Sequence, residues 1–219
     1  MQNMKLESVG ILISLRPFNE RDAVAHIFTR DYGVLVGMMR GAVAAKKNRP
    51  LVGQVGNMVW NARLDSQLGV FHWGAEKNLA VQLMQDARRL SAMNAAFGLI
   101  HALLAEREEY KLLYDETLEL LNELAQGNMA AYLCWEINLL RELGYALDMT
   151  KCSGCGKKDN LTHLSPRTGR AVCGECASPY LNKLYMLPVN LSVTLRFLES
   201  VCMQQGIEMP QMRKMLNIV

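Results

Sequence analysis

The sequence predicts an α+β fold, with a five-stranded barrel at its start and then a helical domain that contains an inserted four-cysteine zinc module. Short apolar runs separated by turn signals fill about the first 75 residues, as in a small β domain. Beyond about residue 78, apolar residues recur with the spacing of helices. Two Cys-x2-Cys pairs interrupt the helical pattern. The expected boundaries are 1–77 for the barrel, 78–150 and 178–219 for the helical domain, and 151–177 for the zinc module.

Five runs in the first part are rich in β-branched and large apolar residues. The expected strands are Val9–Leu15, Ala23–Thr29, Val34–Met39, Val55–Leu64 and Leu68–Trp73. The turns between them are marked by Pro17-Phe18-Asn19, Asp31-Tyr32-Gly33 and Asp65-Ser66-Gln67. Five strands in so short a segment favour a small closed barrel over a sandwich.

Three apolar stripes predict helices before the zinc module. The first stripe has alternating spacings of three and four and consists of Leu90, Met93, Phe97, Ile100 and Leu104. The second is ended by Gly127 and consists of Leu113, Leu120, Leu121 and Leu124. The third is ended by Gly144 and consists of Leu133, Ile137 and Leu140. Such stripes usually face a core, so we expect these residues to be buried.

Two further helices are expected after the module. Pro188 and Asn190 begin the first, which stops at Gly206, and Pro210 precedes a short amphipathic piece at Met212–Leu216. Cysteines outside the Cys-x2-Cys pairs occur at 134 and 202, each on an apolar helical stretch. We expect both to be small buried hydrophobic residues.

The two Cys-x2-Cys pairs, Cys152 with Cys155 and Cys173 with Cys176, are separated by 17 residues. This spacing is typical of a four-cysteine zinc site, because two residues between cysteines allow a tight turn to direct both sulfurs at one tetrahedral ion. The alternatives are two disulfides, a redox Cys-x-x-Cys pair, or coincidence. Zinc is favoured because matched pairs rarely arise by accident.

The predicted zinc ion, one per chain, has a structural role. Four protein ligands leave no open position for water, so the site folds the chain and does no chemistry. A turn signal around Pro166 lies between Leu161–Leu164 and Arg170–Val172, which predicts a hairpin joining the two halves. His163 is an alternative ligand, but four thiolates complete the shell, so it is expected to be an ordinary hairpin residue.

The charge of +3 hides an uneven distribution. Residues 1–75 contain nine basic and five acidic side chains, whereas residues 106–124 contain seven acidic and two basic ones. The sequence shows no secretory signal and no apolar run long enough for a membrane span. Cysteines arranged for a metal fit a reducing compartment, so we expect a cytoplasmic protein with no membrane partner.

The segment 41–50 contains three cations and no acid. The candidate DNA-binding residues are these cations and the arginines that end the neighbouring strands: Arg30, Arg40, Lys46, Lys47 and Arg49. On a barrel they would line a groove that follows a phosphate backbone. The alternative is an ordinary solvated loop. Aromatic residues that could stack on bases, or belong to the core, are Phe28, Tyr32, Trp60, Phe71 and Trp73.

Catalytic motifs are absent from the sequence. None of the four histidines lies in a His-x-Glu or His-Glu-x-x-His motif, which argues against a zinc deaminase or a metalloprotease. No Gly-x-Ser-x-Gly motif occurs. We therefore expect a protein that is not an enzyme.

Three stretches resemble the RecO family of bacterial recombination mediators. Phe28-Thr29-Arg30-Asp31-Tyr32-Gly33, running on to Arg40-Gly41, is similar to a strand, turn and strand of the family's barrel. The segment from Leu140 to Tyr145, followed by the first cysteine pair, resembles the family's last long helix entering its zinc module. Thr168–Cys176 resembles the closing half of that module. The resemblance extends over most of the chain from Gly10 to Cys176.

The resemblance implies an OB-fold barrel whose basic loop binds DNA. It implies a mediator of DNA repair and homologous recombination that binds single- and double-stranded DNA, anneals complementary strands and promotes recombinase loading on coated strands. It also implies a location at the bacterial nucleoid and two protein partners. These are RecR and the acidic tail of single-stranded DNA-binding protein. The tail needs apolar walls and a cation, for which the candidates are Arg88, Arg89 and Arg141.

Two other functions compete with this one. A zinc-dependent DNA-modifying or hydrolytic enzyme is disfavoured by the closed metal site and the missing acid–base motifs. A zinc-ribbon transcription or assembly factor would make its contacts through the zinc module. The position of the basic surface, on the barrel loop or on the zinc hairpin, distinguishes the latter from the mediator.

Overall fold

The computed structural model describes residues 4–45, 49–63 and 68–216. The chain forms two compact units, one comprising Met1–Ala131 with Pro210–Asn217 and the other comprising Tyr132–Met209. The division into a barrel, a helical domain and a zinc module stays a prediction. Among the helices of the described residues, none has both the length and the apolar character that a membrane crossing requires.

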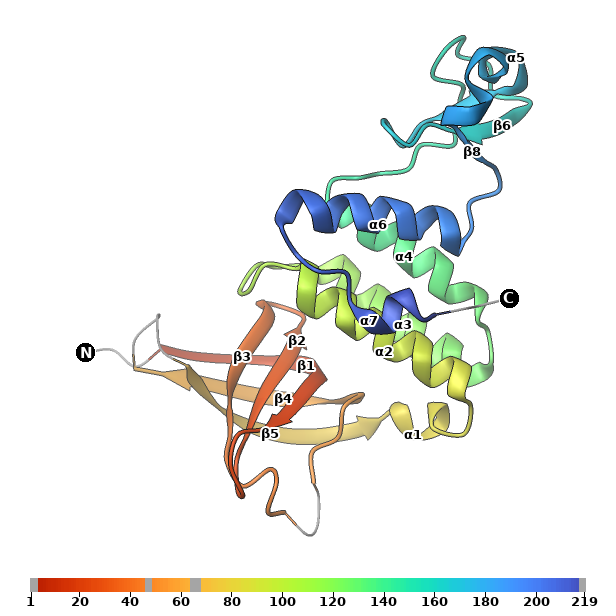
Figure 1. The fold of residues 1–219 in the computed structure, drawn as a ribbon. Helices are drawn as coiled ribbons and strands as arrows, with labels where there is room; N and C mark the ends of the chain where they lie inside the picture. Colours follow the sequence, from red (N-terminus) through yellow and green to blue (C-terminus); the bar gives the residue numbers. More distant parts are fainter. Residues whose placement is uncertain (1–3, 46–48, 64–67, 217–219) are drawn as a thin grey trace. The chain divides into compact units, whose positions relative to one another are not determined.

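The first unit begins with a closed five-stranded barrel (Figure 1). Its strands are β1 (Met4–Pro17), β2 (Ala23–Thr29), β3 (Gly33–Met39), β4 (Gln54–Ala62) and β5 (Gly69–Asn78). They are joined in the order β1-β2-β3-β5-β4, and β4 pairs again with β1. Only the β3–β5 pair is parallel. The OB-like barrel expected from the sequence is confirmed.

Strand β1 is twice as long as the sequence pattern suggested, because it pairs on both edges. Its first part, from Met4 to Ile11, pairs with β4, and its second part, from Gly10 to Pro17, pairs with β2. At Gly10 the two ladders overlap, and a Cβ there would lie 2.4 Å from Ile27 Cγ2. Strand β5 likewise continues past Trp73, the end predicted for it, to Asn78.

The barrel core is built from the inward-facing residues of all five strands. Trp60 is its largest side chain and is 1% exposed. Its indole Nε1 donates a hydrogen bond of 2.9 Å to the carbonyl of Val36. Gly69 begins β5 directly against the ring, where a Cβ would lie 2.0 Å from Trp60 Cε2. A glycine is therefore required at that position for the strand to pass the indole.

Four helices complete the first unit: α1 (Ala80–Leu83), α2 (Ala87–Leu103), α3 (Lys111–Gln126) and α7 (Gln211–Lys214). Asp86 caps α2 by accepting hydrogen bonds from the N–H groups of Arg88 and Arg89. Gly127 ends α3 in the left-handed conformation, with φ of +93°. Helix α7 packs on α2, with Gly98 against Pro210. The first two apolar stripes are buried as predicted, except that Leu90 is half-buried.

Helices and barrel are joined within this unit by side-chain and backbone contacts. The rings of Phe28 and Tyr114 meet edge to face at 5.5 Å. The N–H of Arg107 donates to the carbonyl of Val34 at 3.0 Å, which adds a short bridge to the edge of β3. His26 of β2 meets His101 of α2 with ring centroids 4.2 Å apart.

The second unit contains a helix pair and a small module that includes the four paired cysteines. Its elements are most of α4 (Ala130–Glu142), then β6 (Leu161–Leu164), β7 (Ala171–Cys173), α5 (Gly174–Ala177), the 3-10 turn η1 (Ser178–Lys183), β8 (Tyr185–Met186) and α6 (Leu191–Gln205). Figure 1 shows α4 beside α6. Strands β6 and β7 form the predicted hairpin, and β8 adds a third strand to it.

A buried carboxylate joins the two helices of the second unit. Glu136 is fully buried and accepts hydrogen bonds from Tyr132 Oη at 3.0 Å and from Thr194 Oγ1 at 2.6 Å. Asn190, which was expected to begin α6, caps it by accepting from the N–H groups of Ser192 and Val193. The pairing of α4 with α6 therefore depends on polar groups as well as on apolar packing.

The third predicted apolar stripe is wrong in its orientation. Leu133 and Ile137 are only half-buried, and the buried face of α4 consists of Tyr132, Trp135, Glu136, Leu139 and Leu140. The prediction counted apolar residues alone and so missed a face that includes a glutamate. The same rotation exposes Cys134, which was expected to be buried, whereas Cys202 is buried as predicted.

The His26–His101 contact predicts that stability falls at mildly acidic pH. Burial, and then the charges of His101 and Arg16, lower the pKa of His26 from 6.5 to about 4. Between these values the unfolded chain binds the proton that the folded chain excludes, so stability is lost as pH falls from 6.5 towards 4. Because the ring is half-exposed, solvent reduces the loss to about 1–2 kcal/mol.

Urea unfolding of the wild-type chain and of His26→Gln at pH 7 and pH 4.5 measures this effect. Glutamine removes the titration while keeping a side chain of similar size, so its stability should fall less over this interval. Parallel losses in the two proteins would show that His26 does not carry the effect.

Candidate metal centre and nucleic-acid interface

The four paired cysteines converge on one point. The sulfurs of Cys152, Cys155, Cys173 and Cys176 all lie within 4.8 Å of one another. Those of Cys155 and Cys173 are 3.7 Å apart, close to the edge of about 3.8 Å in a tetrahedron with metal–sulfur bonds of about 2.3 Å. All four are free thiols, and a disulfide would need a sulfur–sulfur distance of about 2.05 Å. The cluster can hold one metal ion.

The first half of the cluster is a tight turn. The N–H of Gly156 donates to the carbonyl of Cys152 at 2.9 Å, and the N–H of Cys152 donates to the carbonyl of Lys157 at 2.7 Å. Gly156 has φ of +78°, which only glycine adopts without strain. The N–H groups of Cys173 and Gly154 point at the sulfur of Cys152, at 3.3 and 3.4 Å. Such contacts orient the ligand and stabilise a thiolate.

The electrostatics of the cluster favour a cation. Backbone N–H groups, first that of Cys173, lower the pKa of Cys152 to about 6. The neighbouring thiols, first that of Cys173, raise the pKa of Cys176 to about 12. One thiolate is therefore stable at neutral pH, but further thiolates need a positive charge between them. A divalent ion would supply it, and Cys152, Cys155, Cys173 and Cys176 would then be its four ligands.

Two of the candidate DNA-binding residues, Arg40 just before the basic segment and Arg49 within it, are exposed. Arg40 follows the end of β3, and Arg49 lies ahead of β4. Among described residues, neither has an ion-pair partner. Lys46 and Lys47, between them, lie outside the described residues.

The start of the basic segment is held against the turn between β1 and β2. The N–H of Gly41 donates to Asp22 Oδ1 at 2.8 Å, and the N–H of Val43 donates to the carbonyl of Arg21 at 3.0 Å. The Gly41 hydrogen bond is the largest cause of the lowered pKa of Asp22, and Arg21 and Arg40 add to it. Cations of the turn and of the segment thus gather at one end of the barrel.

Arg30 does not belong to this group. Register pairs Thr29 with Gly33 and Ala23 with Met39, so Arg30 and Arg40 lie at opposite ends of the β2–β3 hairpin, about 20 Å apart. Arg30 also forms a two-pronged ion pair with Asp115 of α3, at 3.1 and 3.2 Å. Its charge is therefore offset by an acid of the same unit.

The three candidate partner-binding arginines lie in separate places in the chain. Arg88 and Arg89 are in the first turn of α2, where Arg89 pairs with Asp86 at 3.3 Å and donates to the carbonyl of Ala125. Arg141 is in the last turn of α4, in the other unit, and contacts Asn138 and Glu142. Their role in binding stays a prediction.

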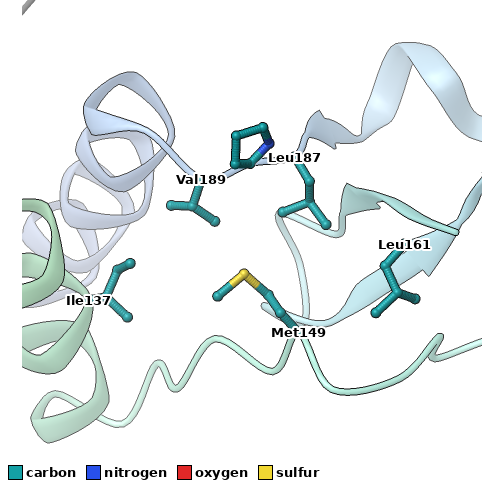
Figure 2. Close-up of a pocket in the computed structure, with 6 residues that line it drawn as sticks. Ile137, Met149, Leu161, Leu187 and Val189 are labelled. Carbon is teal, nitrogen blue, oxygen red and sulfur yellow. The ribbon is translucent and has the colours of Figure 1, made fainter. Parts of the chain in front are cut away.

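The second unit does contain an apolar pocket of about 550 Å³ (Figure 2). Figure 2 shows the side chains of Ile137, Met149 and Val189 facing one another across it. Its lining residues are Ile137, Met149, Leu161, Leu187, Pro188 and Val189. None of the three arginines is among them.

The candidate aromatic residues divide into two groups. Phe28, Trp60 and Phe71 belong to the core, whereas Tyr32 and Trp73 are half-buried. Sequence reasoning missed an exposed aromatic, Phe18, which is 67% exposed in the turn between β1 and β2. The available signal was its position in a turn motif beside Arg16, where no strand pattern would bury it.

Comparison with known proteins gives concordant results. The family model described as "Recombination protein O N terminal" matches residues 1–74, and "Recombination protein O C terminal" matches residues 84–207. A "DNA repair protein RecO" of Dinoroseobacter shibae is 38% identical over 183 residues, which cover 82% of this chain and 76% of that one. That of Rhodospirillum centenum is 40% identical over 185 residues, covering 82% and 73%.

Metal analysis tests the thiolate cluster. We expect one zinc ion per chain, because soft thiolate ligands in a tetrahedron suit zinc. Cys152→Ser should abolish binding and unfold the module, since the metal supplies roughly 10 kcal/mol or more of its folding free energy. Cys134→Ser is the matched control, because that exposed thiol lies outside the cluster. Metal-free wild-type protein whose fold is unchanged by Cys152→Ser would contradict the assignment.

Proposed function

The chain belongs to the RecO family of DNA repair proteins, and from this premise we propose that it binds single- and double-stranded DNA through the basic end of its barrel. We propose further that it anneals complementary strands and promotes recombinase loading on strands coated with single-stranded DNA-binding protein. As a protein of DNA repair it would act in the bacterial cytoplasm, at the nucleoid.

The observation that carries this proposal is the group of exposed cations at one end of the barrel. Arg40 and Arg49 are exposed and have no ion-pair partner among the described residues, in contrast to Arg30. Backbone hydrogen bonds of Gly41 and Val43 hold the chain that directly follows Arg40. Cations without an ion-pair partner are the best suited to bind phosphates, because no existing ion pair has to be broken first.

Annealing follows from charge alone and requires no bond to be made or broken. Complementary strands repel each other through their phosphates. A basic surface that binds both strands screens this repulsion and raises their local concentration. The thiolate cluster supports the fold of the second unit, and we propose zinc as its ion, with no part in a reaction.

Two protein partners complete the proposal, and both come from the family resemblance. One is RecR, which would bind the barrel. The other is the acidic, apolar-ended tail of single-stranded DNA-binding protein, for which Arg88, Arg89 and Arg141 are candidate cations. Arg88 is the most available of the three, because it is exposed and, among described residues, its side chain makes no ion pair.

A zinc-ribbon factor that binds through its metal module is the alternative. The observation that favours it is a second set of exposed cations in that module, which includes Lys158 and Arg167. Another cation of the module, Lys157, is already paired with Glu175 at 2.9 Å. The two functions differ in which cations of the protein neutralise the phosphates of the nucleic acid.

The salt dependence of DNA binding distinguishes them. For single strands, log K falls by about 0.7 per unit of log salt for each phosphate neutralised. The double variant Arg40→Ala/Arg49→Ala, and equally Lys46→Ala/Lys47→Ala, should reduce this slope by about one to two units and weaken all sequences alike. Arg30→Ala should change it by less than half a unit, because Asp115 already offsets that charge.

The matched variant for the alternative is Lys158→Ala/Arg167→Ala, which also removes two exposed cations. A slope that changes in this variant and not in the barrel variants would assign DNA binding to the metal module.

Annealing assays test the mechanism. We expect complementary strands coated with single-stranded DNA-binding protein to anneal without any nucleotide, and annealing to fail when the acidic tail of the coating protein is removed. A requirement for ATP, or equal annealing with and without the tail, would contradict the mediator mechanism.

A further inference from the structure

A polar pocket of about 530 Å³ lies at the end of the barrel where β5 finishes. It is lined by Pro50, Gln54 and the strand residues from Trp73 to Asn78. Trp73 follows Gly69 and Phe71 in the inward-facing series of β5 and packs against the barrel core, yet it is only half-buried. Part of its indole therefore belongs to the core, and the rest borders the pocket.

Small residues of β4 and β5 lie near the Trp73 ring. A bulge between Val55 and Gly56 shifts the register of β4 against β5. At Gly56 the strands approach so closely that a Cβ would lie 2.2 Å from the carbonyl oxygen of Gly74. Gly74 and Ala75, the two residues after Trp73, carry little or no side chain. The opening beside the indole is a result of this small-residue surface.

The indole is held in a fixed orientation by Gln54. The Oε1 atom of Gln54 accepts one hydrogen bond from Trp73 Nε1 at 3.3 Å and another from the N–H of Leu51 at 3.0 Å. With both lone pairs of this oxygen engaged, the amide NH₂ group of Gln54 is the end that can donate to a ligand. The ring and a donor are thus positioned on the same wall.

Another residue of the lining, Asn78, is half-buried. Asn78 Oδ1 is buried and, within the described part of the chain, has no hydrogen-bond partner. A ligand in the pocket does not reach this atom, because protein covers it. Lys77, which precedes Asn78 in the chain, is exposed and also lines the pocket. Arg49 precedes the lining residue Pro50.

We propose that this pocket receives an unpaired nucleobase, which stacks on Trp73 and accepts a hydrogen bond from the amide NH₂ group of Gln54. Every base has a flat π-face and carries donors or acceptors on its edge, as the pocket requires. Lys77 and Arg49 lie where the flanking phosphates would be neutralised. Glu76 also lines the pocket, and its Oε1 accepts a hydrogen bond of 2.6 Å from Asn57 Nδ2.

This inference rests on the proposed binding of DNA to the barrel and adds to it a source of selectivity. Bases in a duplex are stacked and paired, so none is available to the pocket, whereas phosphates are available in both forms. Trp73 therefore strengthens the binding of single strands only, and Arg40 and Arg49 strengthen the binding of both.

Intrinsic fluorescence of the wild-type full-length chain provides the first test. The sequence contains three tryptophans, of which Trp60 and Trp135 are 1% and 2% exposed, whereas Trp73 is half-buried and borders the proposed pocket. Titration with oligothymidylate should quench the emission, and a duplex of equal length should leave it nearly unchanged. Equal responses to the two ligands, or a response to neither despite binding, would overturn the inference.

Affinity measurements on variants provide the second test. Trp73→Leu keeps an apolar side chain against the core but removes stacking, and should weaken single-strand binding roughly tenfold while leaving duplex binding unchanged. Trp73→Phe should restore most of the affinity. His72→Ala is the control, because that exposed neighbour points to the other face of the strand.

The outcomes separate this inference from the proposed function. If Trp73→Leu binds single strands as tightly as wild type while binding stays salt-dependent, the pocket is not a base site and the DNA-binding proposal stands. If the wild-type chain binds neither form of DNA, both fail. If Trp73→Leu does not fold, the wild-type fluorescence decides the question by itself.

Discussion

Closure of the barrel by β1 is the constraint on which the first unit depends. The strand pairs with β4 through its first part and with β2 through its second part, so it leaves no open edge between those neighbours. Closure encloses the large side chains of Trp60 and Phe71, and it fixes which loops share an end of the barrel. The basic segment and the turn between β1 and β2 meet because of this topology.

The same topology determines which arginines of the barrel form ion pairs. Arg30 and Arg40 occupy equivalent positions at the ends of adjacent strands, yet register places them at opposite ends of the hairpin. Arg30 forms an ion pair with Asp115 of α3, whereas Arg40 forms no ion pair with a described residue. A charge that is free to bind phosphate is thus a property of tertiary structure, and a count of lysines and arginines does not reveal it.

In the second unit the constraint is electrostatic. Four thiols within 4.8 Å cannot all ionise without a cation, as the opposite pKa shifts of Cys152 and Cys176 show. A metal ion would therefore link the first turn of the module to the start of α5. The strands of the module are short, so little apolar surface is available to replace such a link. The helix pair is joined differently, through the buried carboxylate of Glu136.

The sequence by itself determined the features that depend on local chemistry. Cysteine spacing predicted the thiolate cluster, because two residues between ligands make one turn. Strand and turn patterns predicted the five strands, and Asn190, Gly127 and Gly206 marked helix ends that the structure confirms. Only the tertiary structure decided the features that depend on long-range pairing. These include the doubled length of β1, the rotation of α4 around a buried glutamate, the pairing of Arg30, and the pocket at Trp73. Each arises where distant segments meet, and local pattern carries no information on which partners a side chain finds there.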